Sequence, residues 1–443
     1  MEKNNKIFAE ITVKNAVFKM AMPSVISSLI LVIYNMADTF FVGQTHDAMQ
    51  VAAVSLTSPV FVMFMAVANL LGIGGSTAIS IFLGENNKQK AKESSAFCCY
   101  ASVILGIIFG IFILIFMDFI LKILGSSPNT YEFSKEYLIY IALGAPFIFF
   151  ANTFRHTVRG EGAASASMIG GMIGTVINII LDPVFILTFN MGTAGAAIAT
   201  VLGNIGGCIY YLYYFQKKTS FLSIKLKYFK PTGTAEKKVI KLGIPAGINS
   251  GLMGISNIVL NNKLAYYGDA PVAAMGVATK VYLLIVFIHM GIANGIQPLL
   301  GYCFGAKNKN RFIGIFNFST VLTIIIGTAL TVLYIVFSSS IIQMFINDKD
   351  VIFYGRDMLI ATVISGPILG VLFICINSMQ AIEHPFPATL VSICRQGFIF
   401  LPLLYVLNFL FGLGGINFTQ AIADYLSAII AIILFRLSLK NIK

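Results

Sequence analysis

The sequence has few charged residues and no tryptophan. Only 11% of its 443 residues are Asp, Glu, Lys or Arg, and the acids number 18. Hydrophobic residues make up 57% of the chain, and its mean hydropathy is +0.86. Soluble globular domains are about 25% charged, so this composition excludes an ordinary soluble enzyme and indicates a polytopic membrane protein. Without tryptophan, tyrosine has to supply the aromatic anchors at the membrane interface.

Motifs for common catalytic chemistry are also missing. The sequence contains no phosphate-binding glycine loop with its lysine, no HExxH zinc motif and no GxSxG nucleophile turn. The six cysteines have no metal-ligand spacing, and we expect them to be small buried hydrophobes. We therefore predict a protein that is not an enzyme, has no cofactor and does not drive transport with ATP by itself.

The net charge of +12 is distributed unevenly among alternating loops. Basic residues concentrate near the N-terminus, around Lys90, in the central stretch 217–241 and in the C-terminal tail, whereas the opposite loops carry acids such as Asp47 and Glu132. By the positive-inside rule the basic side is cytoplasmic, so both termini are predicted inside and the number of spans is even. Membrane topology thus explains the charge, and we expect no nucleic-acid partner.

Apolar runs long enough to cross a bilayer recur about twelve times. The expected membrane helices cover residues 16–41, 52–83, 94–116, 135–156, 164–187, 193–215, 240–265, 274–302, 313–337, 353–380, 388–411 and 415–437. The longest polar stretch divides the chain near its middle. The prediction is an all-α integral membrane protein with a six-helix lobe at 1–215, a cytoplasmic linker at 216–241 and a second six-helix lobe at 242–443.

The two halves resemble each other at a constant offset. Val-Ala-Ala at 51–53 recurs at 272–274, and GENNK at 84–88 is matched by GAKNK at 305–309. Six helices per half is an even number, so both copies enter the membrane from the same side. A parallel repeat of this kind occurs in transporters whose halves rock against each other. The alternative is a duplicated scaffold without transport.

Three carboxylates, Asp38, Asp182 and Asp424, lie well inside apolar runs. Tyr34 precedes Asp38 by about one helical turn, and Asn178 precedes Asp182 by the same spacing, so each pair projects from one helix face. An acid in hydrocarbon is costly and usually marks an ion pathway. We predict that the first two acids bind a cation or a proton, with Asp424 as a secondary candidate. A polar clamp between packed helices is the alternative for Asn178 and Asp182.

At this point the sequence resembles the multidrug and toxic compound extrusion (MATE) family of cation-coupled exporters. The resemblance covers nearly the whole chain, in the number of spans, the two halves and the central linker. The segments that carry it are DTFFVG at 38–43, RGEG at 159–162, NIILDP at 178–183 and GAA at 195–197 followed by Thr200. The chain is similar to those members whose acidic cluster lies in the amino-terminal half.

The resemblance implies a coupling site in the first half. The residues that match the family's cluster are Asp38, Asp182, Asn178 and Thr200 as coupling residues, and Tyr34, Tyr137 and Asn152 as the supporting polar network. Their oxygens suit Na⁺, and two adjacent carboxylates also suit a proton. The sequence does not choose between these ions. We further expect Pro23 to be a conformational hinge, because proline removes a backbone hydrogen bond and permits a kink.

The implied function is export of organic cations and amphipathic aromatic drugs in exchange for H⁺ or Na⁺, by alternating access. We expect a functional monomer in the cell membrane. The alternative is a flippase for lipid-linked cell-envelope precursors, which should have a cavity rich in Arg and Lys. An intramembrane enzyme or receptor is disfavoured by the missing motifs and by the duplication.

Two polar residues of the second half have open roles. His289 is a secondary candidate for ion binding or proton relay, and the alternative is a hydrogen-bonded packing residue. Arg395, near the start of the eleventh predicted span, is expected to anchor that span at the cytoplasmic surface.

Overall fold

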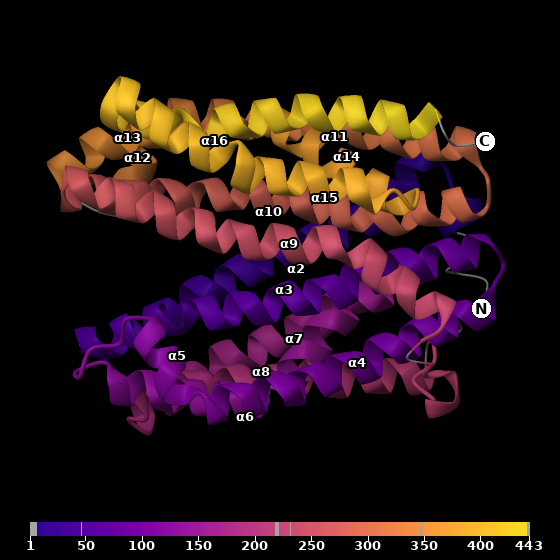
Figure 1. The fold of residues 1–443 in the computed structure, drawn as a ribbon, viewed down its shortest axis with the longest axis horizontal. Coiled ribbons are helices and arrows are strands. Elements are labelled where there is room, and N and C mark those ends of the chain that lie inside the picture. The colour runs from indigo at the N-terminus through magenta and orange to yellow at the C-terminus, as the bar shows by residue number, and fades with distance from the viewer. Residues whose placement is uncertain (1–6, 46, 218–220, 231, 346–347, 441–443) are drawn as a thin grey trace. The chain divides into compact units, whose positions relative to one another are not determined.

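The computed structural model describes an all-helical chain, with no strand among the described residues (Figure 1). The described residues are 7–45, 47–217, 221–230, 232–345 and 348–440. Contacts within the chain define two units. Unit 1 comprises Met1–Glu10 and Ile26–Gly243, and unit 2 comprises Ile11–Val25 and Ile244–Lys443. The predicted lobes at 1–215 and 242–443, with their linker, stay a prediction.

Unit 1 contains most of α2 and continues into the beginning of α9. Its elements are α2 (Val13–Gly43, from Ile26 onward), α3 (Ala48–Gly84), α4 (Lys88–Ile115), α5 (Met117–Ile123), α6 (Tyr131–Gly160), α7 (Ala164–Pro183), the π-helical turn η1 (Val184–Thr188), α8 (Gly192–Lys217), η2 (Leu226–Tyr228) and the first residues of α9 (Thr234–Leu264). The central helix is α6, which packs against α3, α4, α7 and α8.

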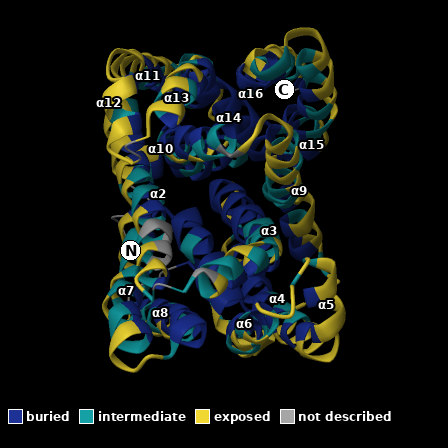
Figure 2. Cartoon of the chain, turned by 90° about the vertical axis from the view of Figure 1, so that its left-hand side faces the viewer, coloured by how far each residue is buried: buried dark blue, intermediate teal, exposed yellow. Residues whose placement is uncertain are grey.

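Unit 2 contains the remaining helices and the first part of α2. Its elements are the rest of α9, η3 (Ala265–Tyr267), α10 (Asp269–Gly305), α11 (Lys309–Val336), α12 (Ser338–Gln343), α13 (Lys349–Val363), α14 (Gly366–Ala381), α15 (Pro385–Ile393), the π-helical turn η4 (Cys394–Phe398) and α16 (Phe400–Lys440). Here α14 is the central helix, packed against α10, α11 and α16. Figure 2 shows α14 largely buried and α12 largely exposed.

The described helices can cross a membrane twelve times. Ten are long and apolar enough by themselves, and α13 and α14, which meet at a 43° bend, form an eleventh span. The last of the ten covers Pro385–Lys440 and contains Gly412, whose φ of 57° and ψ of −136° break the helix. Its 56 residues far exceed the roughly 20 residues that one crossing needs, so it divides into two spans. The predicted number of spans is confirmed.

The apolar core of unit 1 is built around aromatic residues of three helices. Phe64 of α3 lies edge-on to Phe149 of α6, with ring centroids 5.0 Å apart, and also contacts Phe109 of α4. Phe64 and Phe149 are buried together with aliphatic residues of α6. Edge-to-face pairs of this kind add to the packing energy of the buried area. They hold α3, α4 and α6 together and leave α7 and α8 to complete the polar side of the unit.

The sequence repeat is reproduced in the backbone. Asn86 and Lys307, the third residues of the matched segments, both have left-handed φ angles, of 57° and 55°. In each copy the next residue caps the following helix. The side chain of Asn87 accepts from the backbone N–H of Lys90 at 3.1 Å, and that of Asn308 accepts from Arg311 at 3.0 Å. The same turn and cap therefore connect two helices in both halves.

The described part of the predicted linker packs against α4. Ser95 Oγ donates to the carbonyl of Ser223 at 2.8 Å and accepts from its N–H at 2.9 Å. Tyr100 donates to the carbonyl of Ile224 at 2.9 Å. Lys230 forms an ion pair of 2.7 Å with Glu93, and this hydrogen bond and charge raise the pKa of Lys230 above its ordinary value. Residues 221–230 are thus a fixed part of unit 1.

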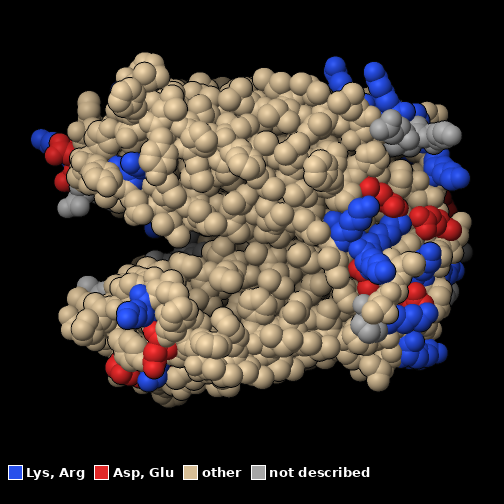
Figure 3. Space-filling view, viewed as in Figure 1, with Lys and Arg blue, Asp and Glu red and all other residues tan. Residues whose placement is uncertain are grey.

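On the face shown in Figure 3, charged side chains gather at the two ends of the helices, and the surface between the ends is almost entirely uncharged. Exposed side chains on that surface are large and apolar, such as Ile107, Ile111 and Phe112 on α4. A continuous apolar surface bounded by charged ends is what a membrane-spanning protein presents to lipid.

Candidate functional site

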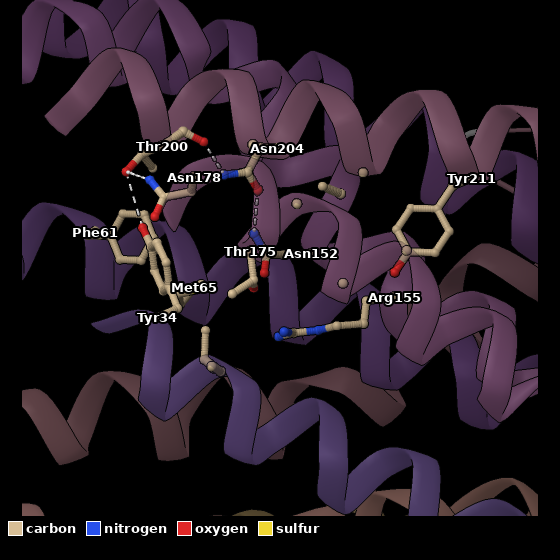
Figure 4. Close-up of a pocket in the computed structure, with 17 residues that line it drawn as sticks. Tyr34, Phe61, Met65, Asn152, Arg155, Thr175, Asn178, Thr200, Asn204 and Tyr211 are labelled. Atoms are coloured by element: carbon tan, nitrogen blue, oxygen red, sulfur yellow. Dashed lines mark hydrogen bonds between the residues drawn. The ribbon is translucent and has the colours of Figure 1, made fainter. Parts of the chain in front are cut away.

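A polar cavity lies inside unit 1, among α2, α3, α6, α7 and α8 (Figure 4). Its volume is about 70 Å³, which is room for more than one water molecule. The residues that line it are Leu31, Tyr34, Phe61, Met65, Ala151, Asn152, Arg155, Gly170, Gly171, Gly174, Thr175, Asn178, Thr200, Gly203, Asn204, Gly207 and Tyr211. We call this space the unit 1 cavity.

Glycines on α7 and α8 shape one wall of the cavity. A Cβ atom added at Gly203 would lie 2.5 Å from the carbonyl oxygen of Gly174, and one added at Gly170 would lie 2.4 Å from the ring of Tyr211. Only glycine permits so close an approach of two helices, as in other membrane proteins. The backbones therefore come together here, and neighbouring side chains extend into the space beside them.

Four residues predicted as site residues form one connected polar group. Tyr34 Oη and Thr200 Oγ1 share a hydrogen bond of 3.1 Å. The side-chain amide of Asn178 donates to Thr200 Oγ1 at 3.4 Å and to Asp182 Oδ1 at 3.2 Å. Asn178 and Asp182 are four residues apart on α7, so one amide group reaches both partners. The structure thus brings these four residues together from three helices.

The supporting network contains a residue that was not among the predicted site residues, Asn204. Its amide donates to the carbonyl of Thr200 at 2.8 Å, and its Oδ1 accepts from Asn152 at 3.5 Å. Asn152 also donates to the carbonyl of Ile148 at 2.9 Å. Sequence spacing could have identified Asn204 as a site residue, because it follows Thr200 by one helical turn on α8 and therefore shares its face.

Three further residues of the first half were predicted to belong to the site or to act as a hinge: Asp38, Tyr137 and Pro23. Asp38 belongs to α2, but its side chain lies outside the part of the chain that the structure describes. Tyr137 of α6 is 8% exposed and belongs to the apolar core instead of the cavity lining. Pro23 lies inside α2, close to the point at which that helix passes from unit 2 to unit 1.

The chemistry of this group is that of a site for a hard cation or a proton. Asp182 is fully buried and Asn178 is 1% exposed. Asn178 Oδ1 has no hydrogen-bond partner among the described residues, and a buried carbonyl oxygen without a donor is costly unless a ligand or water completes it. A carboxylate, an amide oxygen and a hydroxyl are the ligand types that Na⁺ prefers. No group of three His, Cys, Asp or Glu residues suited to a metal ion occurs in the described chain.

Arg155, which was not among the predicted site residues, also lines the cavity. It lies on α6, one turn after Asn152, and is half-buried. Its backbone carbonyl accepts from Ser167 Oγ, but its guanidinium group makes no ion pair or hydrogen bond to any described residue.

In unit 2, Asp424 is neutralised by an arginine. Its Oδ1 accepts from Arg395 Nε at 2.8 Å and from Gln420 at 2.9 Å, and its Oδ2 accepts from Tyr282 at 2.7 Å and from Ser365 at 2.9 Å. The Arg395 side chain is 3% exposed and Asp424 is fully buried. The expectation that Arg395 anchors its span at the membrane surface is therefore wrong. All the hydrogen bonds that this carboxylate accepts come from residues of unit 2, and one of them is an ion pair, which favours a structural role for Asp424.

His289 lies between two backbone carbonyls. Its Nδ1 is 2.8 Å from the carbonyl oxygen of Ile285, and its Nε2 is 3.2 Å from that of Thr323. The residue is fully buried, and it does not line the cavity of unit 2 that contains Arg395 and Tyr282. This position favours the packing alternative over a relay.

Comparison with known proteins agrees with this fold. The MatE family model matches residues 23–184 and again 245–406, so the duplicated halves are both recognised. The chain is 33% identical over 434 residues to the multidrug export protein MepA of Staphylococcus haemolyticus, covering 98% of this chain and 95% of that protein. It is 32% identical to MepA of Staphylococcus aureus strain MSSA476, covering 96% and 94%.

Among solved structures, an outward-facing multidrug resistance MATE family transporter of the MOP superfamily superposes with a TM-score of 0.94 at 24% identity, over 99% of this chain and 98% of the other. That likeness shows the fold. Since the family model covers most of the chain in two copies, as the repeat predicts, this protein belongs to the MatE family of membrane transporters.

Proposed function

We propose that the chain is a secondary active multidrug exporter that exchanges drugs for H⁺ or Na⁺ by alternating access. It is similar over nearly its full length to proteins named as multidrug exporters. The single observation that carries the proposal is the buried polar group of Asp182, Asn178, Thr200 and Tyr34, because a carboxylate inside a membrane-spanning unit is costly without a role in ion passage. No enzyme activity is part of the proposal.

The ion binds at Asp182 and its neighbours. Asn178 Oδ1 and Thr200 Oγ1 complete the oxygen ligands of a bound Na⁺, or Asp182 takes up a proton in its place. Asp38 completes the site as the second carboxylate. In either case the loss of negative charge in the buried site changes the packing of α7 against α8. Ion and drug are exchanged because each prefers a different state of the protein, and a ligand with equal affinity for both states would shift nothing.

The conformational change acts through α2. This helix is one continuous element, yet Ile11–Val25 group with unit 2 and the residues from Ile26 onward with unit 1. Pro23 stands just before that division and removes one backbone hydrogen bond, so bending costs least there. Tyr34, further along the same helix, bonds to Thr200 in the ion site. A change at the site is thereby passed to the helix that both units share.

The alternative function, a flippase for lipid-linked cell-envelope precursors, is less well supported than drug export. A cavity for a pyrophosphate group should present several Arg or Lys residues, whereas the described residues that line the unit 1 cavity include one cation, Arg155. We further propose that the protein is a monomer in the cell membrane with both termini in the cytoplasm, as the loop charges indicate.

Ethidium efflux from cells that lack their own major exporters tests the function. Wild type should lower intracellular ethidium, and Asp182→Asn should reduce the efflux rate roughly tenfold or more, since typical coupling energies correspond to about 5- to 150-fold effects. Asp357→Asn is the matched control, because Asp357 is exposed on α13 of unit 2. Efflux by Asp182→Asn at the wild-type rate would reject the site, and no efflux by a well-expressed wild type would reject the function.

The coupling ion is identified with purified protein in liposomes. A pH gradient and a sodium gradient are imposed separately, and drug movement is followed by fluorescence. The effective gradient should lose its influence in Asp182→Asn while Asp357→Asn responds as wild type. Drug movement that is equally fast without either gradient would contradict ion-coupled exchange.

A further inference from the structure

The segment 221–230 covers the beginning of the lipid-facing side of α4. Exposed apolar side chains form a stripe along that helix: Ile104, Ile107, Ile108 and Ile111. Tyr100 lies one turn before this stripe on the same face. It donates a hydrogen bond to the carbonyl of Ile224 at 2.9 Å, and its ring centroid lies 5.1 Å from that of Phe229. Because tyrosine and charged residues mark the edge of a bilayer, the segment is held at the level of the lipid headgroups.

The outer side of this segment is a short turn with one apolar side chain between two lysines. Leu226, the first residue of η2, is 68% exposed, and its neighbours Lys225 and Lys227 are exposed as well. A single exposed leucine is common on protein surfaces, but this one lies beside the lipid-facing stripe. An apolar side chain between two ammonium groups suits a membrane surface, where the first enters the acyl boundary and the others stay among the phosphates.

The positive charge of the turn is not neutralised within the described chain. Neither of its two lysines forms an ion pair with a described residue, and the acid that the segment contacts, Glu93, is already paired with Lys230 at 2.7 Å. The ammonium groups of Lys92 and Lys227 lie 5.6 Å and 5.1 Å from the centre of the Tyr228 ring. Two like charges are thus held near one ring, and an anion bound between them would remove their repulsion.

We propose that the turn at 225–228, together with Lys92 of α4, is a binding surface for the headgroups of anionic phospholipids. Phosphate oxygens accept from the ammonium groups of Lys92, Lys225 and Lys227, and Leu226 enters the acyl boundary beside them. A zwitterionic headgroup carries its own cation next to the phosphate, so it compensates less of the lysine charge than an anionic one does. The inference gives the protein a lipid partner and does not depend on which molecules it exports.

A fluorescent label at residue 226 tests the lipid contact. Leu226→Cys carries an environment-sensitive NBD group in a Cys394→Ser background, since the other five native cysteines are buried. The protein is placed in mixed liposomes of phosphatidylcholine and phosphatidylglycerol, and one lipid or the other carries a doxyl quencher near the headgroup end of its acyl chain. Both lipids should quench the label, and at an equal fraction of quencher the anionic lipid should quench it more strongly.

Substitution of the lysines tests their part in this preference. The double change Lys225→Gln with Lys227→Gln should remove most of the preference for the anionic lipid, by about fivefold for each lysine near the surface, while quenching by phosphatidylcholine remains. Lys92→Gln alone should reduce the preference in part. Lys307→Gln with Lys309→Gln is the matched control, because it removes the same charge from exposed positions of unit 2. The label should keep its full preference in this control.

Three results would overturn the inference. The first is a label that emits as in water and is quenched by neither lipid, because residue 226 would then not touch the membrane. The second is equal quenching by the two lipids when all lysines are present. The third is a loss of preference in the control as large as that in the double change of the turn. Each result leaves the export function untouched, since ethidium efflux measures that function separately.

Discussion

At the scale of single residues, two buried aspartates, Asp182 of unit 1 and Asp424 of unit 2, have different environments. Asp424 accepts four hydrogen bonds, one of them from Arg395. Asp182 Oδ1 accepts from the uncharged amide of Asn178 at 3.2 Å. The first carboxylate belongs to a buried ion pair, and the second belongs to the polar group beside the unit 1 cavity. The same residue type is therefore structural in unit 2 and proposed as functional in unit 1.

The pairing in unit 2 gives a prediction on stability. Asp424→Asn should lower the free energy of unfolding by about 3–5 kcal/mol, because Arg395 is left buried without its counter-charge. The double variant Arg395→Met with Asp424→Leu removes both charges and should recover most of this loss. Unfolding in detergent is followed with a thiol-reactive dye, since Cys303 and Cys375 of unit 2 are buried in the folded protein. If Asp424→Asn were as stable as wild type, the ion pair would not be what compensates the buried charge of Arg395.

At the scale of elements, the contact between α7 and α8 determines whether the cavity exists. Gly174 and Gly203 approach so closely that a methyl group on either would meet a backbone oxygen of the other helix, at 2.9 Å and 2.5 Å. Asn178 and Asp182 lie on α7, and Thr200 and Asn204 lie on α8. Their separation therefore sets the hydrogen-bond distances of the site.

Widening this contact should damage both stability and binding. Gly203→Ala should destabilise unit 1 by about 1–3 kcal/mol, because the added methyl group overpacks a tight contact. It should also weaken drug binding, since Thr200 is displaced from Asn178. Gly276→Ala is the matched control, as a Cβ there meets no atom within 4 Å. The control should be neutral or slightly stabilising in a helix. Thermal unfolding and ligand titration measure both effects, and a Gly203→Ala variant that matches Gly276→Ala in both would contradict this account.

At the scale of the whole molecule, the chain is a duplication whose halves have diverged in chemistry. The MatE model recognises both halves, and the same left-handed turn and asparagine cap occur in each. Only unit 1 has the connected group of Tyr34, Thr200 and Asn178 beside a buried acid. Unit 2 instead holds the closed ion pair. Duplication preserved the helices, and the polar residues between them changed.

The predicted orientation can be tested with two cysteine reporters. Asn129 lies exposed between α5 and α6, and Lys225 lies exposed in the segment packed on α4. A membrane-impermeant maleimide should label Asn129→Cys on intact cells and Lys225→Cys only after permeabilisation, because the basic side is cytoplasmic. The native cysteines contribute little background, since five of the six are buried. Labelling of Lys225→Cys on intact cells would reverse the topology.

Much of the fold was predictable because it depends on local sequence. The apolar runs predicted all twelve spans, and the matched turns at Asn86 and Lys307 followed from two short sequence segments. The pairing of Asn178 with Asp182 was predictable for the same reason, since both lie on one face of one helix. Asn204 follows this rule as well, and its spacing from Thr200 was available in the sequence.

By itself, the sequence determined the class of protein, the number of spans, the repeat and the pairs within single helices, because hydrophobicity and helical period act over neighbouring residues. Only the tertiary structure decided which polar groups meet across helices. Arg395 and Asp424 are far apart in the chain and are joined only by the packing of η4 against α16. Arg155 stands near the end of the predicted span 135–156, and the packing of α6 beside the glycines of α7 places it in the cavity. Contacts between helices depend on the three-dimensional arrangement of side chains, which no local pattern encodes.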